Sequence, residues 1–276
     1  MTTPTPVPTT GHLTTPDGTR LAYRDQAGQG GQAGQGDQGS RSSGPSRGAP
    51  LLLLHGLAGH MGEWEALLPP LLSDGHRIVA YDARGHGSST RKPKDMSRAA
   101  AVQDALTVIR ALDLAPVTLI GQSLGGHTAL LTAASHPALI HSLVLIEAGP
   151  GGPNPTLPTE IAAWLDKGEH PAFDGVDHVD RVDRATMLAA IVELATTAYW
   201  PAWERVTCST LLVRGAQGTM PDQEVGEMLA RSVRSPSAGP SAGPSTELTT
   251  IEGAGHDVHL DQPERLYAAL RAFLMP

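Results

Sequence analysis

One pentapeptide, Gly121-Gln122-Ser123-Leu124-Gly125, constrains the fold of this chain more than any other feature. An apolar run at 117–120 precedes it, and a helix-like run at 127–135 follows it. A serine in a sharp turn between a strand and a helix has strained backbone angles, and the flanking glycines let neighbouring chain pass without a Cβ clash. The helix that follows directs free N–H groups and its positive dipole end at the same point. The pattern predicts a strand–turn–helix unit that presents the Ser123 hydroxyl to a substrate.

Apolar runs and helix-like runs alternate through most of the remaining chain. Pro16-Asp17-Gly18 is typical of a hairpin turn between two short strands. Later strands are predicted at 51–54, 77–81, 117–120, 142–146, 210–213 and 248–251, and helices at 64–72, 99–112, 127–135, 221–230 and 263–273. Apolar strands separated by helices indicate an α/β fold with a mostly parallel central sheet flanked by helices. Catalytic groups are then expected at the carboxyl ends of the strands.

Residues 150–205 interrupt this alternation because they contain no clear strand. Half of the aromatic residues of a chain that is only 4% aromatic fall there, namely Trp164, Phe173, Tyr199, Trp200 and Trp203. We expect a helical cap at 150–205, inserted into a core formed by residues 1–149 and 206–276. The aromatic side chains would either shape an apolar pocket over the active site or attach the cap to the core.

Two stretches, at about 26–48 and 235–245, have low sequence complexity and too little apolar surface to offset the entropy of ordering. They are predicted to be loops of the core rather than domain boundaries. The single cysteine, Cys208, excludes an internal disulfide and a multi-thiolate metal site, and is expected to be a buried small hydrophobe.

The charge and the hydropathy pattern narrow the class of protein. The net charge of −8 disfavours a nucleic-acid partner. The first ten residues have neither a basic start nor an apolar stretch, so no signal peptide is predicted, and no apolar run approaches the length of a membrane span. These features predict a cytoplasmic protein with no membrane partner, and they do not indicate an oligomeric state.

Four segments, in a fixed order, resemble motifs of the α/β-hydrolase fold family. They are the strand and His-Gly loop at 51–57, the Asp-x-Arg-Gly-His-Gly-x-Ser segment at 82–89, the Gly-x-Ser-x-Gly elbow at 121–125 and the Gly-x-Gly-His segment at 253–256. Order and spacing agree from about Leu13 to Leu274. The resemblance implies an α/β-hydrolase fold in which Asp82 and Arg84 tie loops together and take no part in catalysis.

Ser123 needs a base, because a free serine hydroxyl is a poor nucleophile at neutral pH. Among twelve histidines, His256 suits that role best, since it follows a late strand in a Gly-Ala-Gly loop that can bring it over the sheet. His259 is expected to be an ordinary loop residue of the next turn. His127, just after the serine turn, could contact the catalytic residues without touching the substrate. The resemblance implies structural roles for the histidines at 55 and 86.

The resemblance also implies an oxyanion hole formed by the backbone N–H groups of Leu124 and Leu57. Each such donor stabilises the transition state by about 3 kcal/mol in comparable sites. The His-Gly-Gly-Gly loop is absent, so bulky tertiary esters are not implied. No metal-ligand cluster or nucleotide loop is present in the sequence, so no metal and no cofactor is expected.

The acid that should orient His256 departs from the family pattern. The family usually has an Asp or Glu after the strand that precedes the histidine strand, but residues 213–220 contain no carboxylate. Glu147, at the end of the strand beside the elbow strand, is the preferred candidate, because some lipases of this fold have their acid there. Asp222 is the alternative, although its place in the first turn of a helix favours a structural role. A site without an acid partner is the third possibility.

These residues predict a serine hydrolase that acts on a small to medium apolar carboxylic ester, thioester or lactone through an acyl-enzyme. One alternative is a cofactor-free lyase, a C–C bond hydrolase or a perhydrolase on the same scaffold, because fold does not fix chemistry. Another is a ligand-binding homologue without catalysis, which the missing carboxylate at 217–218 would explain. The predicted partner is a small-molecule, ester-like substrate.

Overall fold

The computed structural model describes residues 8–28, 48–167, 183–232 and 245–275. Most of both low-complexity stretches, together with Phe173 of the predicted cap, lies outside these ranges.

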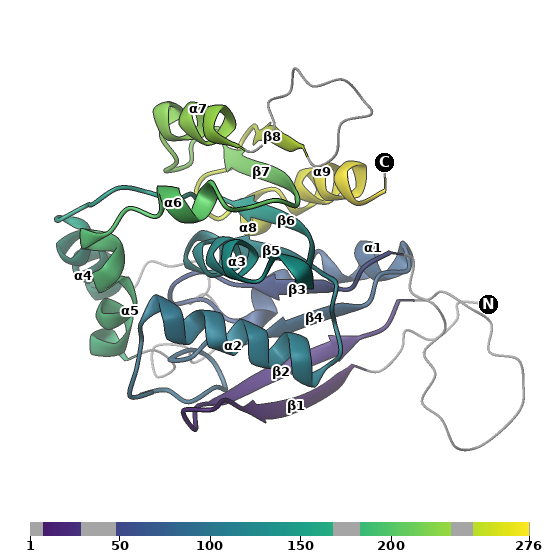
Figure 1. Ribbon diagram of the computed structural model, residues 1–276, viewed down its shortest axis with the longest axis horizontal. Helices are drawn as coiled ribbons and strands as arrows, with labels where there is room; N and C mark the ends of the chain where they lie inside the picture. The colour runs from purple at the N-terminus through teal and green to yellow at the C-terminus, as the bar shows by residue number, and fades with distance from the viewer. Residues whose placement is uncertain (1–7, 29–47, 168–182, 233–244, 276) are drawn as a thin grey trace, which may run out of the picture.

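A single mixed sheet forms the centre of the described part of the chain (Figure 1). Its eight strands lie in the order β1-β2-β4-β3-β5-β6-β7-β8. The first two strands, β1 (Thr9–Thr14) and β2 (Arg20–Gln26), run antiparallel to each other, and β2 runs antiparallel to β4. The other strands are parallel: β3 (Leu51–Leu54), β4 (Ile78–Tyr81), β5 (Val117–Gln122), β6 (Ile140–Ile146), β7 (Ser209–Gly215) and β8 (Thr246–Ile251). The predicted α/β fold with a mostly parallel sheet is confirmed.

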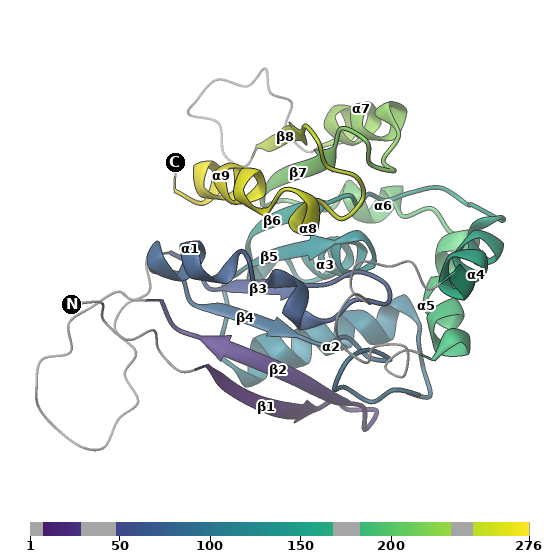
Figure 2. The same ribbon diagram turned by 180° about the vertical axis from the view of Figure 1, so that it is seen from behind.

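Helices cover both faces of the sheet. Figure 1 shows α2 (Arg98–Ala111), α3 (Ser123–Ser135) and α6 (Trp200–Trp203) in front of it. Figure 2 shows α1 (Leu68–Ser73), α8 (Val258–Asp261) and α9 (Pro263–Leu274) on the opposite face. Each face has its own apolar core, so the central strands are buried on both sides, as their continuous apolar runs require.

Where the sequence predicts one helix at 64–72, the structure has two shorter ones. A short 3₁₀ helix, η1 (Met61–Trp64), comes first, and α1 begins only at Leu68. Two prolines occupy the start of α1, where their missing N–H groups interrupt no helical hydrogen bond. A second 3₁₀ turn, η2 (Pro137–Leu139), links α3 to β6. Helix α7 (Asp222–Arg231) lies between β7 and β8 in the sequence.

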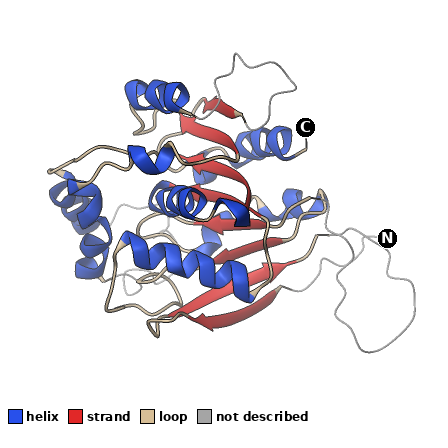
Figure 3. Ribbon diagram, in the orientation of Figure 1, coloured by secondary structure: helices blue, strands red, loops and turns tan. Residues whose placement is uncertain are grey.

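The described part of 150–205 contains helices and no strand. Helices α4 (Leu157–Lys167) and α5 (Arg184–Thr196) contact each other. Together with α6 they are the helices of the described part of this segment, drawn in blue in Figure 3. Trp203 packs into the core and donates its indole N–H to the carbonyl of Met228. These contacts attach the segment to the core. No helix in the described ranges is both long and apolar enough to cross a membrane.

Candidate active site

The serine turn has the backbone strain that the sequence pattern predicts. Ser123 follows β5 directly and has a φ of 49°, which is unfavourable for a residue with a side chain. The flanking glycines are required by close contacts. A Cβ on Gly121 would lie 2.6 Å from the carbonyl oxygen of Gly125, and one on Gly125 would lie 2.3 Å from that of Leu54. The turn therefore holds Ser123 at the carboxyl end of the sheet, at the first turn of α3.

Glu147 lies immediately after β6, also with a positive φ, of 48°. Its side chain is fully buried, and its carboxylate accepts backbone N–H bonds from Gly215 (2.8 Å), Thr219 (2.6 Å) and Met220 (3.2 Å). Burial raises the pKa of this carboxyl, but the hydrogen bonds from His256 and from these backbone groups outweigh burial and hold the pKa below its ordinary value. The carboxylate is therefore ionised at neutral pH.

His256 lies beside this carboxylate. Its Nδ1 is 3.3 Å from Oε2 of Glu147 and 2.8 Å from the hydroxyl oxygen of Thr219. The Thr219 hydroxyl itself donates to Glu147 Oε2 at 3.2 Å, so its lone pairs face His256. This arrangement favours the tautomer with the proton on Nδ1 and leaves Nε2 free to accept a proton.

Gly218 explains how Glu147 reaches this place from the neighbouring strand. A Cβ on Gly218 would lie 2.0 Å from Oε1 of Glu147. The carboxylate therefore occupies space that any side chain at 218 would fill. The β7 loop lacks an acid of its own, and the structure places a carboxylate against it from β6.

Asp222 is placed elsewhere. It begins α7, its side chain is 89% exposed, and it forms an ion pair with Arg214. The structure therefore brings Glu147 to His256, while Asp222 forms a surface ion pair.

The loop that contains Leu57 lies against the serine turn. A Cβ on Gly56 would lie 3.4 Å from the Cβ of Ser123, so Leu57 follows a residue that lies beside the serine. Ala58 has a φ of 60° and donates its N–H to Nε2 of His86 at 3.1 Å. Burial lowers the pKa of His86 to about 3, so its ring is neutral and accepts this bond. His86 thereby holds the loop in place, as the predicted structural role requires.

Other histidines near the site have roles that the sequence did not indicate. His259 is buried, with Nε2 3.4 Å from Oε2 of Glu63 and its ring centroid 4.7 Å from that of Trp64. The sequence predicts an ordinary turn residue here, but His259 connects α8 to η1. His127 packs edge-on against Tyr199, with the ring centroids 4.4 Å apart. No sequence signal marked Glu63 as the partner of His259.

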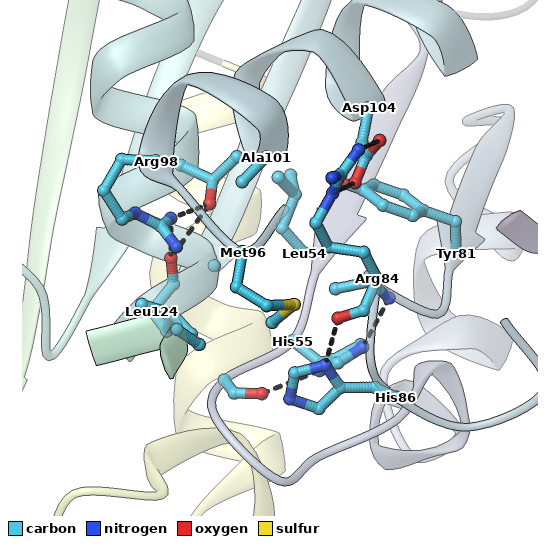
Figure 4. A pocket seen from close by; sticks show the side chains of 15 residues that line it. Leu54, His55, Tyr81, Arg84, His86, Met96, Arg98, Ala101, Asp104 and Leu124 are labelled. Atoms are coloured by element: carbon cyan, nitrogen blue, oxygen red, sulfur yellow. Dashed lines mark hydrogen bonds and ion pairs between the residues drawn. The ribbon is translucent and has the colours of Figure 1, made fainter. Parts of the chain in front are cut away.

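A cavity beside the site is the main feature that sequence reasoning missed (Figure 4). It lies between the ends of β3 and β4 and the starts of α2 and α3, and Arg98 and Leu124 both line it. Arg98 is the first residue of α2 and was not a candidate, because a single arginine at a helix start is typical of a solvated surface. Within the described ranges, no group of three or more His, Cys, Asp or Glu side chains is placed to hold a metal ion.

Comparisons with known proteins agree with this fold. The sequence model of the alpha/beta hydrolase family matches residues 51–269. A serine hydrolase-like protein of Danio rerio is 39% identical over 106 residues, which are 38% of this chain and 32% of that protein. A non-heme chloroperoxidase of Streptomyces lividans is 34% identical over 143 residues, 51% of this chain and 45% of that one. The matches thus span less than half of either relative.

A solved structure matches over almost the whole length. The esterase EaEST from Exiguobacterium antarcticum superposes with a TM-score of 0.77, at 19% identity, over 96% of this chain and 99% of that one. At this identity, the likeness shows a shared fold.

Proposed function

The chain belongs to the alpha/beta hydrolase family, as its four motifs predicted, and on this premise we propose that it is a serine hydrolase. Its substrate is a small to medium carboxylic ester, thioester or lactone with an apolar body. Residues 150–205 act as the cap of this site, and Ala190 of α5 lining the cavity beside Leu124 supports that role.

The proposed reaction begins with attack of Ser123 Oγ on the acyl carbon while His256 Nε2 takes the hydroxyl proton. The backbone N–H groups of Leu57 and Leu124 stabilise the oxyanion of the tetrahedral intermediate. His256 then protonates the leaving group, and the acyl-enzyme is hydrolysed by water that His256 activates. Glu147 stabilises the imidazolium that forms at both stages.

One observation carries this proposal: the buried, ionised carboxylate of Glu147 lies within hydrogen-bond reach of His256 Nδ1. Glu147 and the strained turn of Ser123 both come directly after parallel strands, at the same end of the sheet. A further contact links base and nucleophile segments, since the side-chain amide of Gln122 donates to the carbonyl of His256 at 3.2 Å. An acid that accepts three backbone N–H bonds is fixed in position, and a fixed acid orients the base.

Hydrolysis of p-nitrophenyl acetate, butyrate and octanoate tests the proposal. Ser123→Ala should abolish turnover, and Glu147→Gln should lower kcat by about 10³–10⁴-fold, the loss typical of an acid in such a triad. Asp222→Asn is the matched control, because it changes an exposed carboxylate that pairs only with Arg214, and it should retain wild-type rates.

Two outcomes would redirect the proposal. Glu147→Gln and Asp222→Asn with equal activity would remove Glu147 from the mechanism. A wild type that is no faster than Ser123→Ala on every ester would favour lyase chemistry or ligand binding on this scaffold.

A further inference from the structure

The cavity beside the serine turn is placed to hold part of a substrate. Leu124, one of the two proposed oxyanion donors, and Gly56, which precedes the other donor Leu57, both form its wall. Its accessible space is about 30 Å³, which corresponds to one small group rather than to a hydrocarbon chain. A group bound there would lie against Leu124, the residue that follows Ser123.

Arg98 contributes a buried positive charge to this cavity. The residue is 4% exposed, and its Nη2 donates to the Leu124 carbonyl at 3.1 Å and to the hydroxyl of Thr128. Its Nε has no partner among the described residues, and no carboxylate of that part of the chain is within ion-pair distance of the guanidinium. Burial lowers the pKa of Arg98 to about 10, so the group is still charged at neutral pH.

A second arginine that lines the same cavity, Arg84, differs from Arg98 because its guanidinium pairs directly with carboxylates. Arg84 forms two bonds to Asp104, at 2.6 and 2.7 Å (Figure 4). Its Nη1 also donates to Asp17 at 3.0 Å. Asp104 is therefore already neutralised by Arg84. Both of these carboxylates pair with Arg84, so Arg98 is the guanidinium of the cavity wall that has no direct carboxylate partner among the described residues.

In the described part of 150–205, Glu193 supplies a negative charge near Arg98. Glu193 of α5 accepts the backbone N–H of Arg98 at 3.1 Å and the hydroxyl of Tyr199 at 3.3 Å. Its carboxylate attracts the guanidinium without forming a direct ion pair with it. A buried charge without a close counter-charge is costly, and its cost is removed when an anion binds.

We propose that Arg98 binds a carboxylate carried by the acyl part of the substrate, so that the preferred substrates are monoesters or monothioesters of short dicarboxylic acids, or lactones that carry a free carboxylate. The planar guanidinium fork matches a carboxylate in geometry, and the small cavity excludes a larger anion head. This inference rests on the proposed function and narrows its substrate class. The apolar body of the substrate then ends in an anion that faces away from the leaving group.

The first experiment compares two esters with the wild-type protein. Mono-p-nitrophenyl glutarate carries the anion, and the p-nitrophenyl ester of glutaric acid monoamide is its neutral isostere. We expect kcat/KM to be at least about tenfold higher for the anionic ester, the lower end of the range for a charge-assisted hydrogen bond. A ratio near one would overturn the inference. If neither ester is turned over faster than by Ser123→Ala, the proposed function itself fails.

The second experiment assigns the preference to Arg98. Arg98→Met should bring the ratio of the two kcat/KM values close to one, whereas Arg98→Lys should retain part of it. Arg110→Met, which changes an exposed arginine at the other end of α2, should keep the wild-type ratio. If Arg98 were only structural, both esters would slow equally and the ratio would not change. If Arg98→Met does not fold, the wild-type ratio and Arg98→Lys decide the question.

Discussion

At the residue scale, Thr219 joins the base to the acid. Its hydroxyl oxygen is 0.5 Å closer to His256 Nδ1 than Glu147 Oε2 is, from the distances of 2.8 and 3.3 Å. The hydroxyl donates to the carboxylate and accepts from the imidazole, so it can transmit the orienting effect of the buried charge. Its backbone N–H also donates to Glu147, which fixes the hydroxyl at this position.

Substitution of Thr219 separates this role from packing. Thr219→Val keeps the shape and removes the hydroxyl, so kcat/KM should fall about 10–100-fold, mostly through kcat, which is the cost of one charge-assisted hydrogen bond. Thr219→Ser restores the hydroxyl and should stay within about threefold of the wild type on the same scale. Steady-state kinetics with p-nitrophenyl butyrate measures both. A serine variant as slow as the valine variant would show that the methyl group matters and the hydroxyl does not.

Gly218 gives a second residue-scale prediction. Gly218→Ala places a Cβ 2.0 Å from Oε1 of Glu147, so the carboxylate must move and its bond to the Gly215 N–H is strained or lost. We expect kcat to fall by at least about tenfold, the equivalent of one net hydrogen bond. Gly226→Ala in α7 is the control, since its Cβ would meet no atom within 4 Å. Unchanged kcat in Gly218→Ala would mean that the Glu147 position is not needed for turnover.

Sequence motifs could identify Ser123 and His256 because each lies in a local pattern of glycines. Glu147 could be proposed only as the preferred of two candidate acids, since its contact with His256 joins residues 109 positions apart. Thr219 and Arg98 have no local signature. Their roles come from packing of β7 against β6 and of α2 against α3, which a single sequence does not display.

At the element scale, the Arg84–Asp104 ion pair attaches α2 to the loop after β4. Both side chains are buried, at 3% and 1% exposure, and the pair forms two hydrogen bonds. Burial raises the pKa of Asp104 even though Arg84 counteracts it, so the pair is needed to keep the carboxylate charged. The motif at 82–89 predicted such a tie between loops, but nothing in the sequence identified Asp104 as the partner.

Breaking this pair should destabilise the whole protein. Asp104→Ala removes the buried carboxylate of the pair and leaves the buried Arg84 guanidinium with only the partly exposed Asp17, so the free energy of unfolding should fall by about 3 kcal/mol. Gln103→Ala, an exposed change in the same helix, should alter it by less than about 0.5 kcal/mol. Urea unfolding of both variants measures the difference. A loss below 1 kcal/mol for Asp104→Ala would show that the loop after β4 is held mainly by other contacts.

At the scale of the whole molecule, the apolar patterns predicted the sheet, because a parallel strand buried on both faces must be apolar throughout. They could not predict that charged and titratable groups would also be buried. His86 and His127 are 1% and 4% exposed, and their sequence neighbours do not distinguish them from surface histidines. Burial of neutral imidazoles makes the stability of this fold depend on pH.

His127 allows this dependence to be measured. Burial, assisted by the nearby charge of Arg98, lowers its pKa well below the ordinary value, and both ring nitrogens lack partners among the described residues. As pH falls below about 6.5, the unfolded chain binds a proton at this histidine and the native state does not, so stability is lost toward acid. From pH 8 to pH 5 the loss amounts to about 2 kcal/mol for one such group.

His127→Phe should remove that loss, because the phenyl ring can keep the edge-on contact with Tyr199 and does not titrate. The unfolding free energy of the variant relative to the wild type should therefore rise by about 2 kcal/mol between pH 8 and pH 5. Urea unfolding at both pH values gives this difference. His141→Phe, which changes an exposed histidine, is the control and should give a smaller change. An equal offset at both pH values would mean that the unfolded and native chains bind the proton alike, and that burial of His127 does not contribute to acid sensitivity.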